Sequence, residues 1–238
     1  MIFTKQQIVS SNYLGADAKL SALGVFQLVE NAITEGMAAQ HIDGMTIRRL
    51  YGAFWVFSKN KVEILDEVEW GDTVTVESFV SSKSSAKLNV DTAIKKAEGQ
   101  IVAYSRCEMC PLDVATGRIR RTSTVGVDDS IVVEPALREV AFDKLNCDDL
   151  PVVEEVTVRS TNIDFSRHAN NVEYLRFIFN TYSVQELLSR PIRELEVNYV
   201  SQSYEGDVLR VHKAAVDGCD LFAITKSAQL VIKCTITR

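Results

Sequence analysis

Hydrophobic residues recur at helical spacing in two long segments of the chain, from about residue 21 to 40 and from about residue 170 to 189. In the first segment the repeating positions are Leu23, Phe26, Val29, Ile33 and Met37. In the second they are Tyr174, Leu175, Ile178, Tyr182 and Leu188. Ser21 is a suitable N-cap for the first segment, and Pro191 follows the second. We therefore predict two helices, and their many aromatic and β-branched residues indicate that each is buried against a larger structure.

Most of the remaining chain is rich in Val, Ile, Thr, Phe and Tyr, a composition that is typical of β-strands. Between the two helices we predict strands at residues 54–65, 73–81, 86–97 and 100–112. After the second helix we predict strands at residues 193–202, 207–216, 221–226 and 229–237. Turn signals that contain glycine separate them: Trp70-Gly71-Asp72, Glu98-Gly99, Thr116-Gly117, Glu205-Gly206-Asp207 and Asp217-Gly218.

The order of these elements, one long helix followed by about four antiparallel strands, occurs twice. When Asp72 is aligned with Asp207, other positions match at the same offset: Val62 with Val197, Gly71 with Gly206, and Val76 with Val211. A strand-rich unit with a single helix that is apolar over most of its circumference indicates a sheet wrapped around that helix. The pattern therefore predicts two similar modules, each of the α+β class.

The length of 238 residues allows one large domain or two small ones. The repeat favours two modules of roughly 115 residues each. We expect an N-terminal module over residues 1–130, a connector over residues 131–151 and a C-terminal module over residues 152–238.

Composition and charge exclude several classes of protein. The hydrophobic fraction of 46% and the charged fraction of 24% are typical of a globular protein rather than a disordered or membrane one. The net charge of −6 gives no overall positive field to attract nucleic acid. The N-terminus lacks the apolar core of a signal peptide, and the longest apolar stretch, residues 51–57, is far shorter than a membrane span. The five cysteines are an odd number, which fits reduced thiols. We expect a cytoplasmic protein that binds neither nucleic acid nor membrane.

Groups that can carry chemistry are concentrated just before the second predicted helix. Residues 162–171, Asn-Ile-Asp-Phe-Ser-Arg-His-Ala-Asn-Asn, contain one of only three histidines. An imidazole and a carboxylate can act as base or nucleophile, and a helix N-terminus can stabilise an oxyanion. The same residue types are also common as loop and capping residues, so the residues alone leave both interpretations open.

This segment resembles the Asp-x-Asn-x-His-x-Asn-Asn motif of the acyl-acyl carrier protein (acyl-ACP) thioesterases, which terminate fatty acyl chains in plants and bacteria. Other stretches resemble the same family in the same order, at residues 54–58, 62–64, 70–74, 112–121 and 196–207. The resemblance thus covers nearly the whole chain, and the order of the motifs is more specific than any one of them.

The resemblance implies a tandem hotdog fold of the α+β class, in which each module is an antiparallel sheet wrapped around one long helix. It implies hydrolysis of fatty acyl-ACP thioesters to free fatty acid and carrier protein, the step that ends chain elongation. It implies no cofactor and no metal ion. The first module, which lacks the motif, would build the pocket for the acyl chain with the apolar face of its helix.

The resemblance assigns roles to particular residues. Asp164 and His168 match the catalytic aspartate and histidine of the family, and Ser166 stands where the motif has asparagine. On the later strand, Gln202 and Ser203 align with the catalytic glutamate and the cysteine or alanine after it. The catalytic candidates are therefore Asp164, His168, Ser166 and Gln202. Asn170 and Asn171 are candidates for substrate binding. In the first module, Leu20 and Ser21 lie near the position expected for the histidine.

Arg118, Arg120 and Arg121 form a basic cluster on an otherwise acidic chain, and Arg48 and Arg49 form a second one. Such clusters are commonly only solvated surface. In the context of the resemblance, the first cluster is a candidate for binding the acidic carrier protein or its phosphopantetheine phosphate, because arginine matches the geometry of phosphate.

Cys107 and Cys110 have the CxxC spacing of metal or redox sites. They lie in a predicted strand, where residues three apart point to opposite faces, and no second CxxC or histidine pair accompanies them. We interpret both as structural.

Two other functions remain open at the level of the sequence. A hydratase or dehydratase of the same fold would also use a histidine and a carboxylate on a thioester. A binding protein that keeps the acyl pocket without catalysis is the second alternative, because Gln202 cannot accept a proton as glutamate can. The sequence also leaves the oligomeric state open, a homodimer included.

Overall fold

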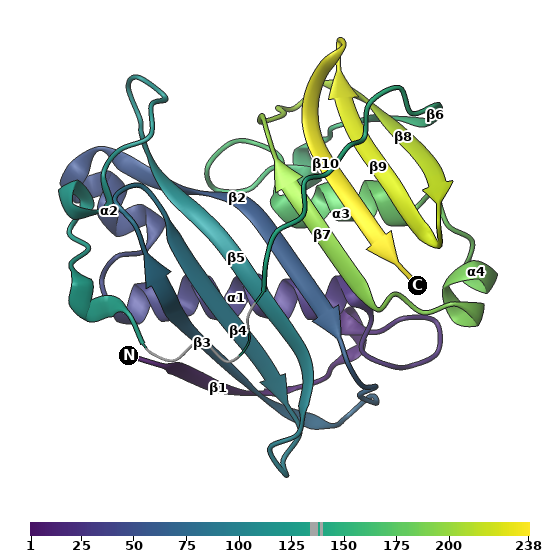
Figure 1. The fold of residues 1–238 in the computed structure, drawn as a ribbon, viewed down its shortest axis with the longest axis horizontal. Coiled ribbons are helices and arrows are strands. Elements are labelled where there is room, and N and C mark those ends of the chain that lie inside the picture. Colours follow the sequence, from purple (N-terminus) through teal and green to yellow (C-terminus); the bar gives the residue numbers. More distant parts are fainter. Residues whose placement is uncertain (134–137, 139) are drawn as a thin grey trace. The chain divides into compact units, whose positions relative to one another are not determined.

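The N-cap expected at Ser21 is present in the computed structural model, which describes residues 1–133, 138 and 140–238. The Ser21 hydroxyl accepts a hydrogen bond from the Gly24 N–H at 3.0 Å, and helix α1 runs over Ala22–Ala39 (Figure 1). The chain divides into a first unit, Met1–Ala141, and a second unit, Phe142–Arg238. The division falls within the expected connector, of which residues 134–137 and 139 lie outside the described part of the chain.

The first unit contains a five-stranded antiparallel sheet in the order β1-β3-β4-β5-β2. The bounds are β1 Phe3–Ile8, β2 Ala53–Ile64, β3 Thr73–Lys83, β4 Leu88–Lys95 and β5 Ile101–Asp113. The last four agree closely with the predicted strands. Strand β1 is not predicted from the sequence, because it lies at the edge of the sheet and four of its six residues are polar.

A second helix of this unit, α2 Gly44–Tyr51, is also absent from the prediction. Asp43 caps it by accepting from the N–H groups of Met45 and Thr46 at 3.0 Å each, and Gly52 ends it in the left-handed conformation. These two residues are the only sequence signals for the helix, because α2 buries little more than Ile47.

The second unit repeats the same strand order with β6-β8-β9-β10-β7, again antiparallel throughout. The bounds are β6 Val152–Thr157, β7 Glu194–Tyr199, β8 Val208–Val216, β9 Cys219–Lys226 and β10 Gln229–Thr237. Strand β6 corresponds to β1 and, like it, is missed by the sequence pattern. The predicted pair of modules is thus present as two units of one strand order.

The predicted second helix is wrong in its extent. It consists of α3 Asn171–Phe179 and α4 Val184–Ser189. The break has a local cause, because Ser183 and Glu186 form a capping box that starts a new helix. Between the two helices the ring of Tyr182 packs on Phe222, and its hydroxyl donates a hydrogen bond to Asp220 at 2.7 Å. These buried contacts fix the segment that separates the two helices.

The turns that the sequence repeat relates are the same in detail. Gly71 and Gly206 both have a φ of 88°. Asp72 accepts from the N–H of Glu69 at 3.0 Å, and Asp207 accepts from the N–H of Tyr204 at 2.7 Å. The repeat seen in the sequence is therefore a structural repeat of the backbone.

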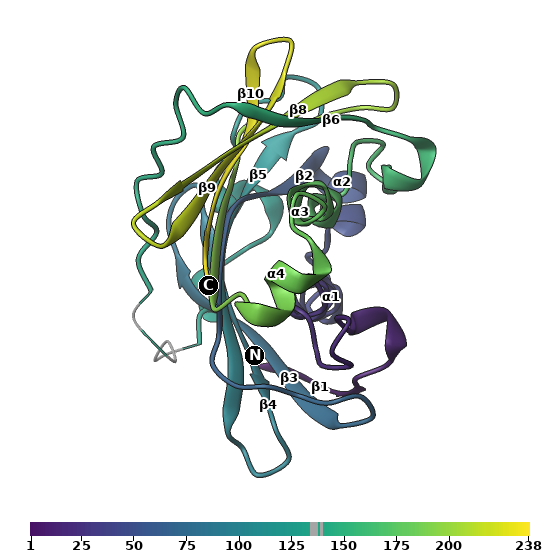
Figure 2. The same ribbon diagram turned by 90° about the vertical axis from the view of Figure 1, so that its right-hand side faces the viewer.

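Each sheet packs one face against the long helix of its own unit, α1 in the first and α3 in the second (Figure 2). Residues of α1 that are buried include Val25, Phe26, Val29 and Ile33, and Leu175 and Ile178 of α3 are fully buried. Cys107 and Cys110 are free thiols buried in β5, and burial raises the pKa of both. In the described part of the chain, no helix is long and apolar enough to cross a membrane.

Candidate active site

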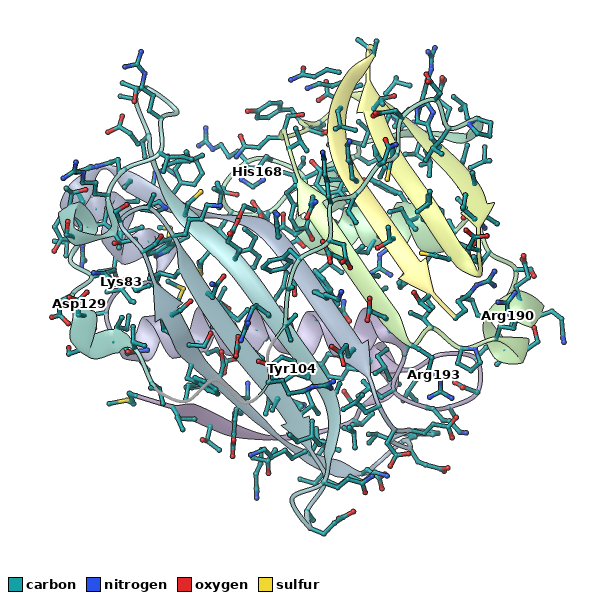
Figure 3. All side chains as sticks on the ribbon, viewed as in Figure 1. Lys83, Tyr104, Asp129, His168, Arg190 and Arg193 are labelled. Carbon is teal, nitrogen blue, oxygen red and sulfur yellow. The ribbon has the colours of Figure 1, made fainter. Side chains whose placement is uncertain are left out.

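The loop between β6 and α3 closes on itself and carries the candidate groups. Ile163 and Ala169 form a β-bridge, and the N–H of Asp164 donates to the carbonyl of His168 at 3.1 Å. Arg167 turns the chain with a φ of 69°, a conformation that few residues other than glycine adopt. The loop therefore holds residues 164–168 in one fixed turn at the start of α3, where Figure 3 labels His168.

Ser166 lies between the other two candidates of this loop. Its Oγ is 2.8 Å from Nε2 of His168 and also hydrogen-bonds to Oδ1 of Asp164. The Ser166 N–H donates to the same carboxylate oxygen at 2.8 Å. Asp164, Ser166 and His168 thus form one continuous hydrogen-bonded set, and all three are only partly buried.

The carbonyl of Ala169 fixes the orientation of the imidazole. It lies 3.2 Å from Nδ1 of His168 and can only accept, so this hydrogen bond requires a proton on Nδ1. A neutral His168 then presents a lone pair at Nε2 to Ser166.

Ser166 has one hydroxyl proton for two acceptors, the Nε2 lone pair of His168 and the Asp164 carboxylate. Both hydrogen bonds are made at once when one further proton is present on either partner. The three residues can therefore take up one proton and release it again.

The segment with Gln202 is attached directly to this loop. The N–H of Ala169 donates to the carbonyl of Ser203 at 2.8 Å, and the N–H of Ser203 donates to the hydroxyl of Tyr174 on α3 at 3.0 Å. Burial raises the pKa of Tyr174. The Gln202 carboxamide oxygen accepts from the Tyr204 hydroxyl at 3.1 Å. The backbone next to Gln202 is thus bonded to the motif loop, and Ser203 is fully buried.

Asn170 serves as the N-cap of α3. Its side-chain oxygen accepts from the N–H of Val172 at 2.8 Å, and its own N–H donates to the carbonyl of Asn162 at 2.9 Å. The capping interpretation of Asn170 is therefore correct. Its side-chain oxygen is used by the cap, so its NH₂ group is the part that could donate a hydrogen bond to a substrate. Asn171 is the first residue of the helix, so its N–H has no acceptor within the helix.

The first unit has the same loop with different side chains. The N–H of Gly15 donates to the carbonyl of Lys19 at 2.8 Å, just as Asp164 donates to His168. Ala18, like Arg167, has a positive φ, and the N–H of Leu20 donates to the carbonyl of Val68. Lys19 therefore occupies the position of the histidine, directly before Leu20 and Ser21, near which the sequence places it. Lys19 forms an ion pair with Glu67 instead.

The three arginines of the basic cluster differ from one another. The guanidinium of Arg120 donates hydrogen bonds to the carbonyls of Tyr51 and Thr124. It also forms an ion pair with Asp113 at 3.8 Å, so it has partners within the first unit. Arg118 and Arg121 are exposed. All three belong to the first unit, whereas the motif loop belongs to the second. Across the described ranges, no group of three or more His, Cys, Asp or Glu side chains is arranged to hold a metal ion.

Comparison with known proteins gives a family for the second unit. Residues 147–235 match the family model for the acyl-ACP thioesterase C-terminal domain. The oleoyl-acyl carrier protein thioesterase of Coriandrum sativum is 20% identical over 176 residues, which are 69% of this chain and 47% of that protein. The dodecanoyl-[acyl-carrier-protein] hydrolase of Umbellularia californica is 23% identical over 231 residues, 88% of this chain and 58% of that protein. The chain spans about half the length of the curated relatives that it matches.

Solved structures share the fold over the whole chain. An acyl-ACP thioesterase from Bacteroides thetaiotaomicron has a TM-score of 0.89 at 18% identity, covering 99% of this chain and 97% of that one. The 12:0-ACP thioesterase from Umbellularia californica has a TM-score of 0.89 at 19% identity, covering 99% and 96%. These likenesses show the tandem hotdog fold, and the match of residues 147–235 confirms the resemblance to the acyl-ACP thioesterases seen in the sequence.

Proposed function

We propose that the protein hydrolyses fatty acyl-ACP thioesters to free fatty acid and carrier protein, and that the site is the loop of Asp164, Ser166 and His168. The observation that carries the proposal is the position of the Ser166 hydroxyl, within hydrogen-bonding distance of both the imidazole and the carboxylate. Hydrolysis needs a group that takes a proton from water and returns one to the thiolate, and this set can do both.

In the proposed reaction, water attacks the thioester carbonyl and its proton passes to the pair of Asp164 and His168. The carbon–sulfur bond then breaks, and the pair returns the proton to the leaving thiolate. Ser166 connects the two partners, and Gln202 holds the water through its carboxamide without accepting its proton. We assign the stabilisation of the oxyanion to the N–H of Asn171, at the positive end of α3.

The first unit has a different part in this proposal. Its motif-equivalent loop has Gly15 and Lys19 in place of the aspartate and the histidine, and Asp17 in place of Ser166. We assign it the binding of the acyl chain along the apolar face of α1. The carrier protein is the proposed partner, and Arg118 and Arg121 are the exposed cations proposed to contact it. The cytoplasm remains the proposed location, on the sequence grounds given above.

A thiol-release assay tests the function. Purified protein is incubated with saturated acyl-ACP and with enoyl-ACP of matched chain length, and free thiol and product mass are measured. Hydrolysis predicts free thiol and free fatty acid from both substrates. Water addition to the enoyl thioester without thiol release would identify a hydratase, and bound acyl-ACP with neither reaction would identify a binding protein. Either result would overturn the proposal.

A further inference from the structure

A row of buried polar side chains crosses the sheet of the first unit. Ser78 of β3, Thr92 of β4 and Ser105 of β5 are directly paired across neighbouring strands, and Asn60 of β2 is diagonal to Ser105. Asn60, Thr92 and Ser105 have an exposed fraction of 0%, and Ser78 has 3%. Thr92 Oγ1 lies 3.2 Å from Ser78 Oγ, and Ser105 Oγ donates to Asn60 Oδ1 at 2.7 Å. Four polar residues thus lie at one level of the sheet, where a core would ordinarily be apolar.

The polar row faces α1. The opposite face carries the charged residues of the same strands, including the ion pairs Lys95–Glu77 and Arg106–Asp91. Because successive residues of a strand point to opposite faces, the row lies on the other side, which α1 covers (Figure 2). The thiol of Cys107 supports this orientation. Its pKa is raised by burial and, to a smaller extent, by the nearby charge of Glu30 on α1. Cys107 is paired with Asn60 in the ladder.

Asn60 is left with an unused donor. Its Oδ1 accepts from Ser105, while its Nδ2 is buried and has no hydrogen-bond partner among the described residues. A buried amide donor without an acceptor costs roughly 1–3 kcal/mol, so such groups persist where something else satisfies them. The missing partner must bring an acceptor oxygen to this point beneath α1.

The second unit shows that the fold itself does not require this row. Val62 corresponds to Val197 in the repeat, and the strand pairing relates Ser105 to Cys234 and Thr92 to Phe222. Leu195 stands at the position of Asn60. The unit with the candidate catalytic loop is therefore apolar at these three positions, while Lys213 stands at the position of Ser78 and packs on the ring of Tyr182.

We propose that the protein prefers acyl chains that carry a neutral oxygen, a hydroxyl or an oxo group, and that Asn60 Nδ2 donates a hydrogen bond to that oxygen. This proposal rests on the function proposed above and on the acyl chain lying beneath α1. A neutral oxygen is favoured over a carboxylate because the polar row contains no cation and Glu30 lies close to it. Ser105, which holds the Asn60 carboxamide, is a positioning residue for the same contact.

The test compares thiol release from dodecanoyl-ACP with release from hydroxydodecanoyl-ACP and oxododecanoyl-ACP, with the oxygen near the thioester, at mid-chain or at the chain end. We expect kcat/KM to be about tenfold higher for at least one oxygenated chain, which is the range expected for one buried hydrogen bond. In Asn60→Leu, this ratio should fall to about one. Asn89→Leu is the matched control, because Asn89 lies in the same sheet on the opposite face and the ratio should keep its wild-type value.

The rates of the wild-type protein on plain and oxygenated chains already test the proposed preference. If it hydrolyses dodecanoyl-ACP as fast as every oxygenated chain, the proposal is overturned while the thioesterase function stands. If Asn60→Leu folds, becomes more stable and leaves the ratio unchanged, Asn60 binds only a buried water and the proposal is likewise overturned. If Asn60→Leu fails to fold, Ser105→Ala, which removes the hydrogen bond that holds the Asn60 carboxamide, must lower the ratio. If no thioester is hydrolysed at all, the proposed function fails, and the acyl preference is then measured by calorimetric binding of hydroxydodecanoate against dodecanoate.

Discussion

The hydroxyl oxygen of Ser166 lies 2.8 Å from Nε2 of His168, and the same oxygen is hydrogen-bonded to Asp164. The position that holds asparagine in the related motif therefore holds, in this chain, a group that can pass a proton between the acid and the base. An asparagine side chain can bind both partners but cannot relay a proton.

Replacing Ser166 tests this link. Ser166→Ala removes the bridge, and we expect kcat for acyl-ACP to fall by about tenfold to a hundredfold, toward the lower end of what general acid–base catalysis contributes. Ser166→Asn restores the residue of the family motif and should keep more activity than the alanine variant. Thiol release and thermal melting are measured together, so that loss of fold is recognised. Equal activity in wild type and Ser166→Ala would exclude a role in proton transfer.

His168 is predicted to be essential for turnover. His168→Ala should lower kcat/KM by at least about a hundredfold, because no other imidazole lies in the motif loop. Lys19→Ala is the matched control, since Lys19 occupies the same place in the loop of the first unit and should leave turnover near the wild-type value. Full activity in His168→Ala would remove this loop as the site.

If Gln202 holds the attacking water, its inability to accept a proton should limit kcat. Gln202→Glu should raise kcat several-fold at neutral pH and introduce a new acidic limb in the pH–rate profile, because a carboxylate can accept the proton of the water that it holds. Gln202→Ala should lower kcat, since the water loses its partner. The carboxamide also accepts from Tyr204, so Tyr204→Phe measures how much of either effect comes from this hydrogen bond. A Gln202→Glu variant with unchanged kcat and pH profile would show that the side chain does not contact the water.

Arg118 and Arg121 are predicted to contribute to binding of the carrier protein and not to the hydrolysis step. The double variant Arg118→Ala/Arg121→Ala should raise KM for acyl-ACP several-fold at low salt, and less at high salt, because exposed charges are screened. The same acyl group on a small uncharged thiol should be hydrolysed as before. Arg120→Ala should instead lower the melting temperature, because this guanidinium binds the carbonyls of Tyr51 and Thr124. An equal loss on both substrates in the double variant would contradict docking.

Asp207 makes the stability of the second unit depend on pH. Partial burial opposes ionisation of Asp207, but hydrogen bonds from the Tyr204 N–H and the Lys226 ammonium outweigh it and lower its pKa. A carboxyl whose pKa is lower in the folded state stabilises the fold above its unfolded pKa, near 4, and this contribution is lost as pH falls through the folded value.

Asp207→Asn should therefore reduce the free energy of unfolding by about 1 kcal/mol at pH 7. The difference from wild type should shrink as the pH is lowered below about 4, where the wild-type carboxyl is protonated as well. Urea titrations of both proteins at several pH values measure this. A difference that stays constant to the lowest pH would show that ionisation of Asp207 does not contribute.

Local sequence determined much of this protein. Hydrophobic periodicity and glycine turns predict α1 and eight of the strands, and the alignment of Asp72 with Asp207 predicts two units, because period and turn chemistry are properties of short segments. The motif at residues 164–171 and its family resemblance indicate the candidate site from the sequence alone. Asp164, Ser166 and His168 are separated by single residues, so one loop is enough to bring them together.

Only the tertiary structure decided the rest. The capping box of Ser183 and Glu186 is local, but the contacts of Tyr182 with Phe222 and Asp220 of β9 join residues far apart in the chain, and no periodicity reports them. The equivalence of Lys19 and His168 follows from backbone hydrogen bonds, because the two loops share almost no side chains. The polar row of Asn60, Ser78, Thr92 and Ser105 is scattered over four strands in the sequence. Strand register alone brings these residues to one level beneath α1, since pairing fixes which side chains of distant segments become neighbours.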